Sequence, residues 1–182
     1  MRRVRFGRVS NAVPGDDRRP PEAATWPDLL AQVRSCRICA DQLEPRPVLR
    51  LARDSRVIVI GQAPGSKVHA SGVPWDDRSG AQLVEWLGVS RETFDDPHNF
   101  GILPMGFCYP GKGRSGDLPP PPVCAETWHP ALTHALTGVR LTLLVGQYAQ
   151  RAKLGRRRKR NLTETVRAFE DYGPDTLPLP HP

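Results

Sequence analysis

Apolar residues along this chain follow two patterns, short continuous runs and the three-to-four spacing of an amphipathic helix. Val57–Ile60 is a continuous branched run that ends at a glycine, which is typical of a strand buried in a parallel sheet. Leu141–Val145 is a second clear strand pattern, and Gly146 begins the next helix. The helical spacing is clearest near the start of the chain, at Trp26, Leu29, Leu30 and Val33.

Weaker patterns supply the remaining strands. Ile102 and Leu103 predict a short strand between the two clear ones, and Leu177–Leu179 predicts a fourth. Residues 109–122 are rich in glycine and proline, so we expect a loop there. Strands that alternate with helices indicate an α/β protein, a three-layer sandwich with a central, mainly parallel four-stranded sheet.

Two further helices are expected between these strands. The loop Gly72–Gly80 leads into a helix that is predicted to carry Leu83, Trp86 and Leu87 on one side. A second helix is predicted over Val123–Leu136. Its inward positions are expected to be Ala125, Trp128, Leu132 and Leu136.

The length of 182 residues suits one domain with a sizeable core. Residues 1–24 carry many Arg, Pro and Asp residues and few apolar ones, so we expect a disordered basic lead before a domain over residues 25–182. The basic start lacks the apolar stretch of a secretory signal, and no apolar run approaches the roughly 18 residues of a membrane span. A cytoplasmic protein is therefore expected.

The four cysteines of the chain form two pairs. Cys36 and Cys39 are separated by two residues, and Cys108 and Cys124 by 15 residues. Without export, these thiols are expected to be reduced ligands instead of disulfides. Four thiolates suit either a tetrahedral zinc ion or a cubane iron–sulfur cluster, and ordinary buried thiols are the alternative.

Three loops are expected to meet at the carboxyl edge of the sheet, where open α/β proteins bind ligands. They are Gly61–Gly65, Pro104–Tyr109 and His181–Pro182. The glycine patterns that bind dinucleotides or nucleotide phosphates do not occur in the first loop. Neither class of nucleotide site is therefore indicated.

The first loop reads Gly61-Gln62-Ala63-Pro64-Gly65, and Gly72-Val73-Pro74-Trp75 follows it. With the cysteine spacing and the late His181-Pro182, this order of motifs resembles the uracil-DNA glycosylase superfamily, closest to its iron–sulfur branch, over about residues 26–182. The resemblance implies a DNA repair hydrolase of base excision. Its substrate would be a damaged base, usually uracil, in single- or double-stranded DNA, and its four cysteines would hold a 4Fe-4S cluster, with zinc as the alternative.

The resemblance also implies roles for the loop residues. The target base, flipped out of the DNA, would lie on the Gly61–Gly65 backbone with Trp75 stacked on it. His181 would stabilise the departing base with a hydrogen bond. Apart from the resemblance, Asp76 or Asp77 would support the developing sugar cation, as a carboxylate does in glycoside cleavage. The plainer alternatives are a core tryptophan at the sheet edge, an unordered histidine and aspartates that cap a helix.

The chain departs from the family pattern at three places. The family loop has a carboxylate where Gln62 stands, and an asparagine that reads uracil where Pro104 stands. The family chain also continues beyond its His-Pro motif with a serine and a last helix, so a fragment or a truncated gene is expected here. The base preference and the activity depend on how the chain compensates for these differences.

The charge pattern favours a nucleic acid as partner. The net charge is +7, and a run of five cations, Arg156, Arg157, Arg158, Lys159 and Arg160, follows a predicted helix. Such a run suits phosphate contacts, although a solvated loop is the alternative. Lys112 and Arg114 would extend the same surface. We expect a monomer that binds DNA and no membrane.

Two other classes of function stay open. The first is a non-catalytic DNA-binding module on the same scaffold. The second is a small domain stapled by a metal, with no nucleic acid partner. Formation of abasic sites in uracil-containing DNA distinguishes the enzyme from both.

Overall fold

The computed structural model of the protein describes residues 25–182, so the lead predicted over residues 1–24 lies outside the described residues. Four strands form one sheet in the order β2-β1-β5-β6. They are β1 (Val57–Ile60), β2 (Phe100–Ile102), β5 (Leu141–Val145) and β6 (Thr176–Leu179). All three neighbouring pairs are parallel. The predicted four-stranded parallel sheet is confirmed.

The register of the sheet brings the ends of the strands to one edge. Val59 stands opposite Ile102 on one side and Leu143 on the other, and Val145 stands opposite Leu179. Because the strands are parallel, the segments that follow β1, β2, β5 and β6 all leave the sheet at its carboxyl edge.

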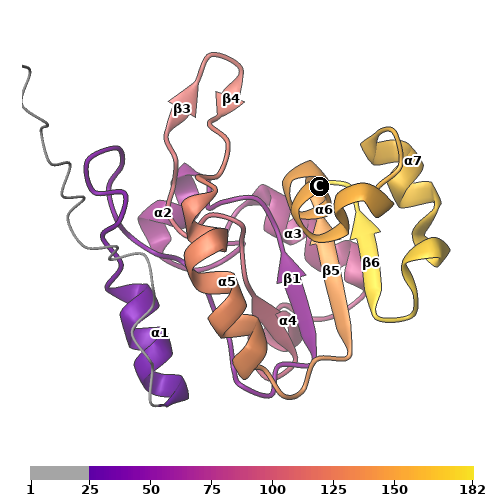
Figure 1. Cartoon of the computed structure of the whole chain (residues 1–182), viewed down its shortest axis with the longest axis horizontal. Helices are drawn as coiled ribbons and strands as arrows, with labels where there is room; N and C mark the ends of the chain where they lie inside the picture. The colour runs from indigo at the N-terminus through magenta and orange to yellow at the C-terminus, as the bar shows by residue number, and fades with distance from the viewer. Residues whose placement is uncertain (1–24) are drawn as a thin grey trace, which may run out of the picture.

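Two hydrophobic clusters cover the two faces of the sheet. Ile58 and Ile60 belong to the cluster that also contains residues of α1 (Trp26–Arg34) and α5 (Val123–Ala135). Val59, between them, belongs to the other cluster with residues of α3 (Arg78–Leu87) and α4 (Arg91–Asp95). Side chains of a strand alternate between faces, so the three layers of the sandwich follow from this division (Figure 1).

The remaining helices are short and connect these layers. They are α2 (Ser66–Ser71), α6 (Gly146–Leu154), α7 (Leu162–Arg167), and two 3-10 turns at Gly155–Arg157 and Phe169–Tyr172. Across residues 25–182, none of the helices has the length and apolar character that crossing a membrane requires.

Two expectations about local structure are wrong. The segment predicted as a loop contains a small antiparallel hairpin, β3 (Lys112–Gly113) and β4 (Gly116–Asp117), with Lys112 paired to Asp117. Figure 1 shows this hairpin projecting beyond the carboxyl edge of the sheet. Trp86, predicted to share one side of its helix with Leu83 and Leu87, is 47% exposed. Leu83 and Leu87 of the same helix pack against the core.

Candidate functional site

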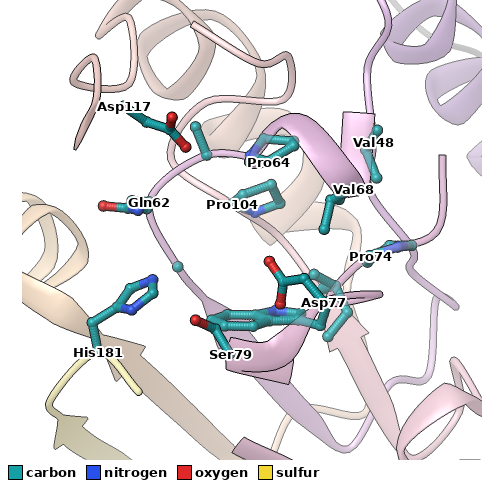
Figure 2. A pocket seen from close by; sticks show the side chains of 15 residues that line it. Val48, Gln62, Pro64, Val68, Pro74, Asp77, Ser79, Pro104, Asp117 and His181 are labelled. Atoms are coloured by element: carbon teal, nitrogen blue, oxygen red, sulfur yellow. The ribbon is translucent and has the colours of Figure 1, made fainter. Parts of the chain in front are cut away.

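A cavity of about 160 Å³ opens at the carboxyl edge of the sheet. Fifteen residues line it (Figure 2). They come from the segment before β1, the loop after β1, α2, the loop before α3 with the start of α3, the end of β2 and the segment after it, the hairpin, and the segment after β6. The whole predicted loop Gly61–Gly65 lines the cavity, together with Trp75, Asp77 and His181. The fold therefore brings together eight of the nine predicted catalytic and base-binding residues, all except Asp76.

The Gly61–Gly65 loop is fixed by backbone hydrogen bonds to the segment after β2. The amide of Met105 donates to the Gly61 carbonyl at 3.0 Å, and the amide of Gly106 donates to the Gln62 carbonyl at 2.9 Å. The amides of Ala63 and Gly65 donate to no acceptor within residues 25–182. An amide without a partner in the protein can donate to water or to a bound molecule.

The indole of Trp75 lies against this loop. A β-carbon built on Gly61 would be 3.0 Å from Trp75 Cζ2, so a larger residue at this position would push the ring away. Trp75 is half-buried and also packs against the cluster that contains Val59. It thus combines the two predicted alternatives, since it lines the cavity and rests on the core at the sheet edge.

Trp75 has an unusual backbone conformation, with φ at 58°. A left-handed conformation costs a residue other than glycine about 1–3 kcal/mol and is kept only where neighbouring contacts hold it. Arg91 provides such a contact, because its Nη1 donates to the Trp75 carbonyl at 2.9 Å. Arg91 is held in turn by Asp95, at 2.7 Å from Nε.

The two adjacent aspartates have different surroundings. Asp77 is half-buried and lines the cavity, while Asp76 is exposed and does not line it. Asp77 Oδ1 accepts a hydrogen bond from the Gly80 amide at 2.8 Å as the N-cap of α3. Asp77 therefore caps the helix through one oxygen, and its other oxygen, Oδ2, takes no part in the cap.

His181 lies at the end of the cavity near Trp75, with 5.9 Å between the two ring centroids. Its side chain packs on Gly146, where an added β-carbon would be 3.5 Å from His181 Cβ and 3.7 Å from Cδ2. Its Nδ1 is 2.8 Å from the Pro182 backbone oxygen. That oxygen only accepts, so Nδ1 carries the proton, and Nε2 donates to a bound base only when the imidazole is protonated.

Two polar residues of the site were not predicted. Ser79 lines the cavity and donates to the Pro182 oxygen at 3.1 Å. Asp117, on β4, also lines the cavity and accepts a hydrogen bond from Tyr109 Oη at 3.1 Å. Figure 2 shows its carboxylate at the rim beside the loop. No local spacing in the sequence connects Asp117 with the loop, because the hairpin that positions it was not predicted.

The four cysteines, all of them free thiols, line one second pocket. Burial and the neighbouring thiols raise the pKa values of Cys39, Cys108 and Cys124, that of Cys124 to about 12. The apolar walls of the pocket, which include Phe107, disfavour four charged thiolates that have no cation beside them. A bound cationic group would lower the thiol pKa values again. Among the described residues no three His, Cys, Asp or Glu side chains converge closely enough to hold a single ion.

Trp128 gives a second indication of what the cysteine pocket fits. Its side chain lines the pocket, and its buried indole N–H finds no hydrogen-bond partner in the described part of the chain. A buried donor without a partner is costly. Four soft thiol ligands, an apolar wall and an unused donor fit a sulfur-containing cluster, whose sulfur atoms accept hydrogen bonds.

The basic run divides into two groups. Arg157 donates to the Asp171 carbonyl at 3.1 Å and lies over the Tyr172 ring, and Lys159 pairs with the Asp171 carboxylate at 2.6 Å. These two cations contact the protein itself. Arg156 and Arg160 are exposed, and Arg158 is half-buried.

Comparison with known protein families matches residues 50–182 to the Uracil DNA glycosylase superfamily. The matched range includes the complete sheet and the lining of the cavity apart from Val48. Cys36 and Cys39 precede it. The match spans well over half of the chain and coincides with the fold that builds the cavity, so this protein belongs to the uracil DNA glycosylase superfamily.

Proposed function

We propose that the protein is a DNA glycosylase that hydrolyses the N-glycosidic bond of a damaged base, with uracil as the first candidate. The observation that carries the proposal is the cavity itself. In a member of this superfamily, it places the Gly61–Gly65 loop and the indole of Trp75 around one space at the carboxyl edge. A base inside a duplex is out of reach of such a cavity, so the nucleotide must be flipped into it.

Different residues of the cavity act on the base and on the sugar. Trp75 stacks on the base, and the free amides of Ala63 and Gly65 bind oxygens of the base or the sugar. Protonated His181 donates from Nε2 to the departing base, which leaves as an anion. The free oxygen of Asp77 faces the positive charge that develops on the sugar.

The direct test is incubation with uracil-containing single- and double-stranded oligonucleotides, followed by alkaline cleavage of abasic sites. Strand breaks at the uracil position are expected. Trp75→Ala should lower the rate by about 5- to 150-fold, because stacking contributes about 1–3 kcal/mol. Trp86→Ala, which removes an exposed tryptophan of α3, is the matched control and should keep the wild-type rate.

The rival function predicts a different result in the same assay. A non-catalytic DNA-binding module binds these oligonucleotides and leaves no abasic site at uracil or at any other lesion tested. Breaks that persist at full rate in both Trp75→Ala and His181→Ala would also contradict the proposed site. Binding without any breaks would favour the module.

We also propose that the chain belongs to the iron–sulfur branch and that Cys36, Cys39, Cys108 and Cys124 hold a 4Fe-4S cluster, with zinc as the alternative. When bound, the group would act as a structural tie between the first helix and the segment that carries the hairpin. The shared pocket and the unused N–H of Trp128 support this. Free thiols also suit a cytoplasmic location.

The composition of the purified protein tests the cluster. Iron and sulfide with a broad visible absorbance are expected, and Cys108→Ser should lose both. A colourless protein with one zinc per chain would favour the alternative. A protein that binds neither would contradict the proposed metal centre, while leaving the glycosylase assay unaffected as a separate test.

We propose that DNA phosphates contact Arg156, Arg158 and Arg160, because the other two cations of the run have partners within the protein. A monomer suffices for this binding. Neutralising the three arginines to glutamine should weaken binding for every sequence and lower the salt slope by about 0.9 for each duplex phosphate that the variant no longer neutralises. Arg157→Gln is the control, and we expect it to lower stability more than the slope. An unchanged slope in the triple variant would contradict the phosphate binding.

A further inference from the structure

The predicted catalytic loop of this protein contains no carboxylate, because it reads Gly-Gln-Ala-Pro-Gly. Hydrolysis of a glycosidic bond needs a negative group near the sugar, which supports the developing cation and accepts the proton of the attacking water. The chain must therefore supply this group from another segment if the proposed function holds.

Two carboxylates lie on either side of the end of that loop. A β-carbon built on Gly65 would be 3.5 Å from Asp117 Oδ2 and 4.0 Å from Asp77 Oδ2. Both residues line the cavity. In Figure 2 the two carboxylates are seen on different sides of the space beside the loop. Gly65 carries no side chain that would separate them.

Each carboxylate has one oxygen engaged and the other free. Asp77 Oδ1 caps α3 through the Gly80 amide. Asp117 Oδ1 accepts from Tyr109 Oη. In both residues it is Oδ2 that approaches Gly65. These bonds hold each carboxylate in one orientation, which is the arrangement that a preorganised site requires.

The two residues differ in access to water. Asp77 is half-buried below the rim, whereas Asp117 is exposed on the projecting hairpin. A group that accepts a proton from the attacking water and returns it to the solvent needs such access. We propose that Asp117 is a catalytic carboxylate of this site, which orients the attacking water and accepts its proton, while Asp77 supports the sugar cation. This inference rests on the proposed glycosylase function.

The step balances as a hydrolysis. The water oxygen forms a bond to C1′ of the sugar, and the bond between C1′ and the base nitrogen breaks. The electron pair of that bond leaves with the base. One proton of the water passes to Asp117 Oδ2 and then to solvent, and the departing base takes a proton from His181 or from solvent.

Tyr109 is a positioning residue in this arrangement, since it touches Asp117 and not the cavity. A phenol hydroxyl is a hydrogen-bond donor at neutral pH, and Tyr109 Oη lies 3.1 Å from Asp117 Oδ1. The phenol therefore donates to the carboxylate throughout the reaction. Tyr109→Phe removes this bond and keeps the ring.

The first experiment is single-turnover excision from a uracil-containing oligonucleotide at saturating protein. Asp117→Asn keeps the shape of the side chain and should lower the rate by about 100-fold, the usual effect of losing a general base. Binding of the oligonucleotide should change less than about threefold, because the asparagine keeps the contact surface. Glu126→Gln, which neutralises an exposed carboxylate of α5 outside the cavity, is the control and should keep the rate.

The second experiment does not depend on turnover. It compares the affinity for oligonucleotides with a cationic pyrrolidine abasic-site analogue and with a neutral tetrahydrofuran analogue. The wild type should prefer the cation, and Asp117→Asn should lose about tenfold of this preference, because one facing negative charge is gone. Tyr109→Phe should lose part of the excision rate and keep most of the preference.

The outcomes separate the two proposals. Wild-type protein that forms no abasic sites overturns the glycosylase, and the abasic-analogue ratio then still decides whether the Asp117 carboxylate lies close to the bound sugar. Asp117→Asn that equals the wild type in both rate and preference overturns the role of Asp117, while excision by the wild type upholds the glycosylase. If Asp117→Asn unfolds at the same temperature as the wild type, a reduced excision rate comes from the changed site and not from loss of folding.

Discussion

The carbonyl oxygen of Trp75 lies so close to Gly80 that a β-carbon at position 80 would be 1.8 Å from it. Gly80 is in the first turn of α3, where alanine is otherwise favoured over glycine by about 1 kcal/mol. Glycine at this position thus makes room for the backbone of the Trp75 loop, although it lowers the stability of the helix.

Gly80→Ala should therefore destabilise the protein by about 2–4 kcal/mol, since backbone atoms of the Trp75 loop must move. Urea unfolding measures the change, and the excision rate should fall with it. Gly88→Ala is a matched control at the end of the same helix. Its φ is 65° and no atom would meet the added carbon, so only about 1 kcal/mol should be lost. Equal losses in both variants would contradict the close approach of Trp75 to Gly80.

Arg91 supports the same loop from the other side. It donates to the Trp75 carbonyl and to Asp95, and the Asp95 carboxylate also accepts from Arg50. Arg91→Lys keeps the charge but loses the planar fork that reaches two partners at once. We expect the single-turnover rate constant of excision to fall by about tenfold. The free energy of unfolding should fall by about 1–2 kcal/mol.

Arg78→Lys, on the exposed first turn of α3, is the control for Arg91→Lys and should leave both properties unchanged. Tryptophan fluorescence on titration with abasic-site DNA gives a further measurement. If Arg91→Lys binds and excises like the wild type, the left-handed Trp75 is held by the packing against Gly80 alone.

Sequence patterns predicted the parts of the fold that local composition determines. The runs Val57–Ile60 and Leu141–Val145 became β1 and β5 with the predicted bounds, because a buried parallel strand needs apolar side chains on both faces. The hairpin of β3 and β4 was missed, since two-residue strands joined by backbone bonds leave no apolar alternation to detect.

The site was predictable only where a motif is continuous in the sequence. The Gly61–Gly65 loop and Trp75 are part of such motifs, and they line the cavity. Asp117 arrives through the pairing of a hairpin, and Arg91 acts through a backbone carbonyl, which any residue possesses. Both interactions depend on tertiary structure. The sequence around a charged residue therefore does not show that the residue takes part in one.

Gln150 links α6 to the strand that precedes His181. Its side chain is fully buried, and its Nε2 donates to the Leu179 carbonyl at 2.8 Å and to the Leu144 carbonyl at 3.3 Å. Gln150→Leu removes these donors and leaves carbonyls without them. We expect a stability loss of about 1–3 kcal/mol and a lower excision rate, because the segment of His181 is held less firmly.

The comparison for Gln150→Leu is Gln147→Leu, an exposed position in the first turn of the same helix. This variant should keep the stability and the excision rate. An unimpaired rate in Gln150→Leu, together with the expected loss of stability, would show that His181 is positioned without this link.

His129 should make the stability of the protein depend on pH. It is 2% exposed, and burial, with the charge of Lys153 adding, lowers its pKa to about 4, while its Nε2 donates to the Pro104 carbonyl at 3.0 Å. The unfolded chain, in which this histidine has a pKa near 6.5, binds more protons between pH 4 and pH 6.5 than the folded chain does. The stabilising contribution is therefore complete above about pH 6.5 and is lost as the pH falls towards 4.

Urea unfolding should show that His129 lowers the free energy of unfolding by about 2–3 kcal/mol at pH 4.5 relative to pH 7.5. His129→Gln keeps an amide donor without a titrating group, and its stability should change less over the same interval. The same pH dependence in both proteins would mean that carboxylates, and not His129, cause it.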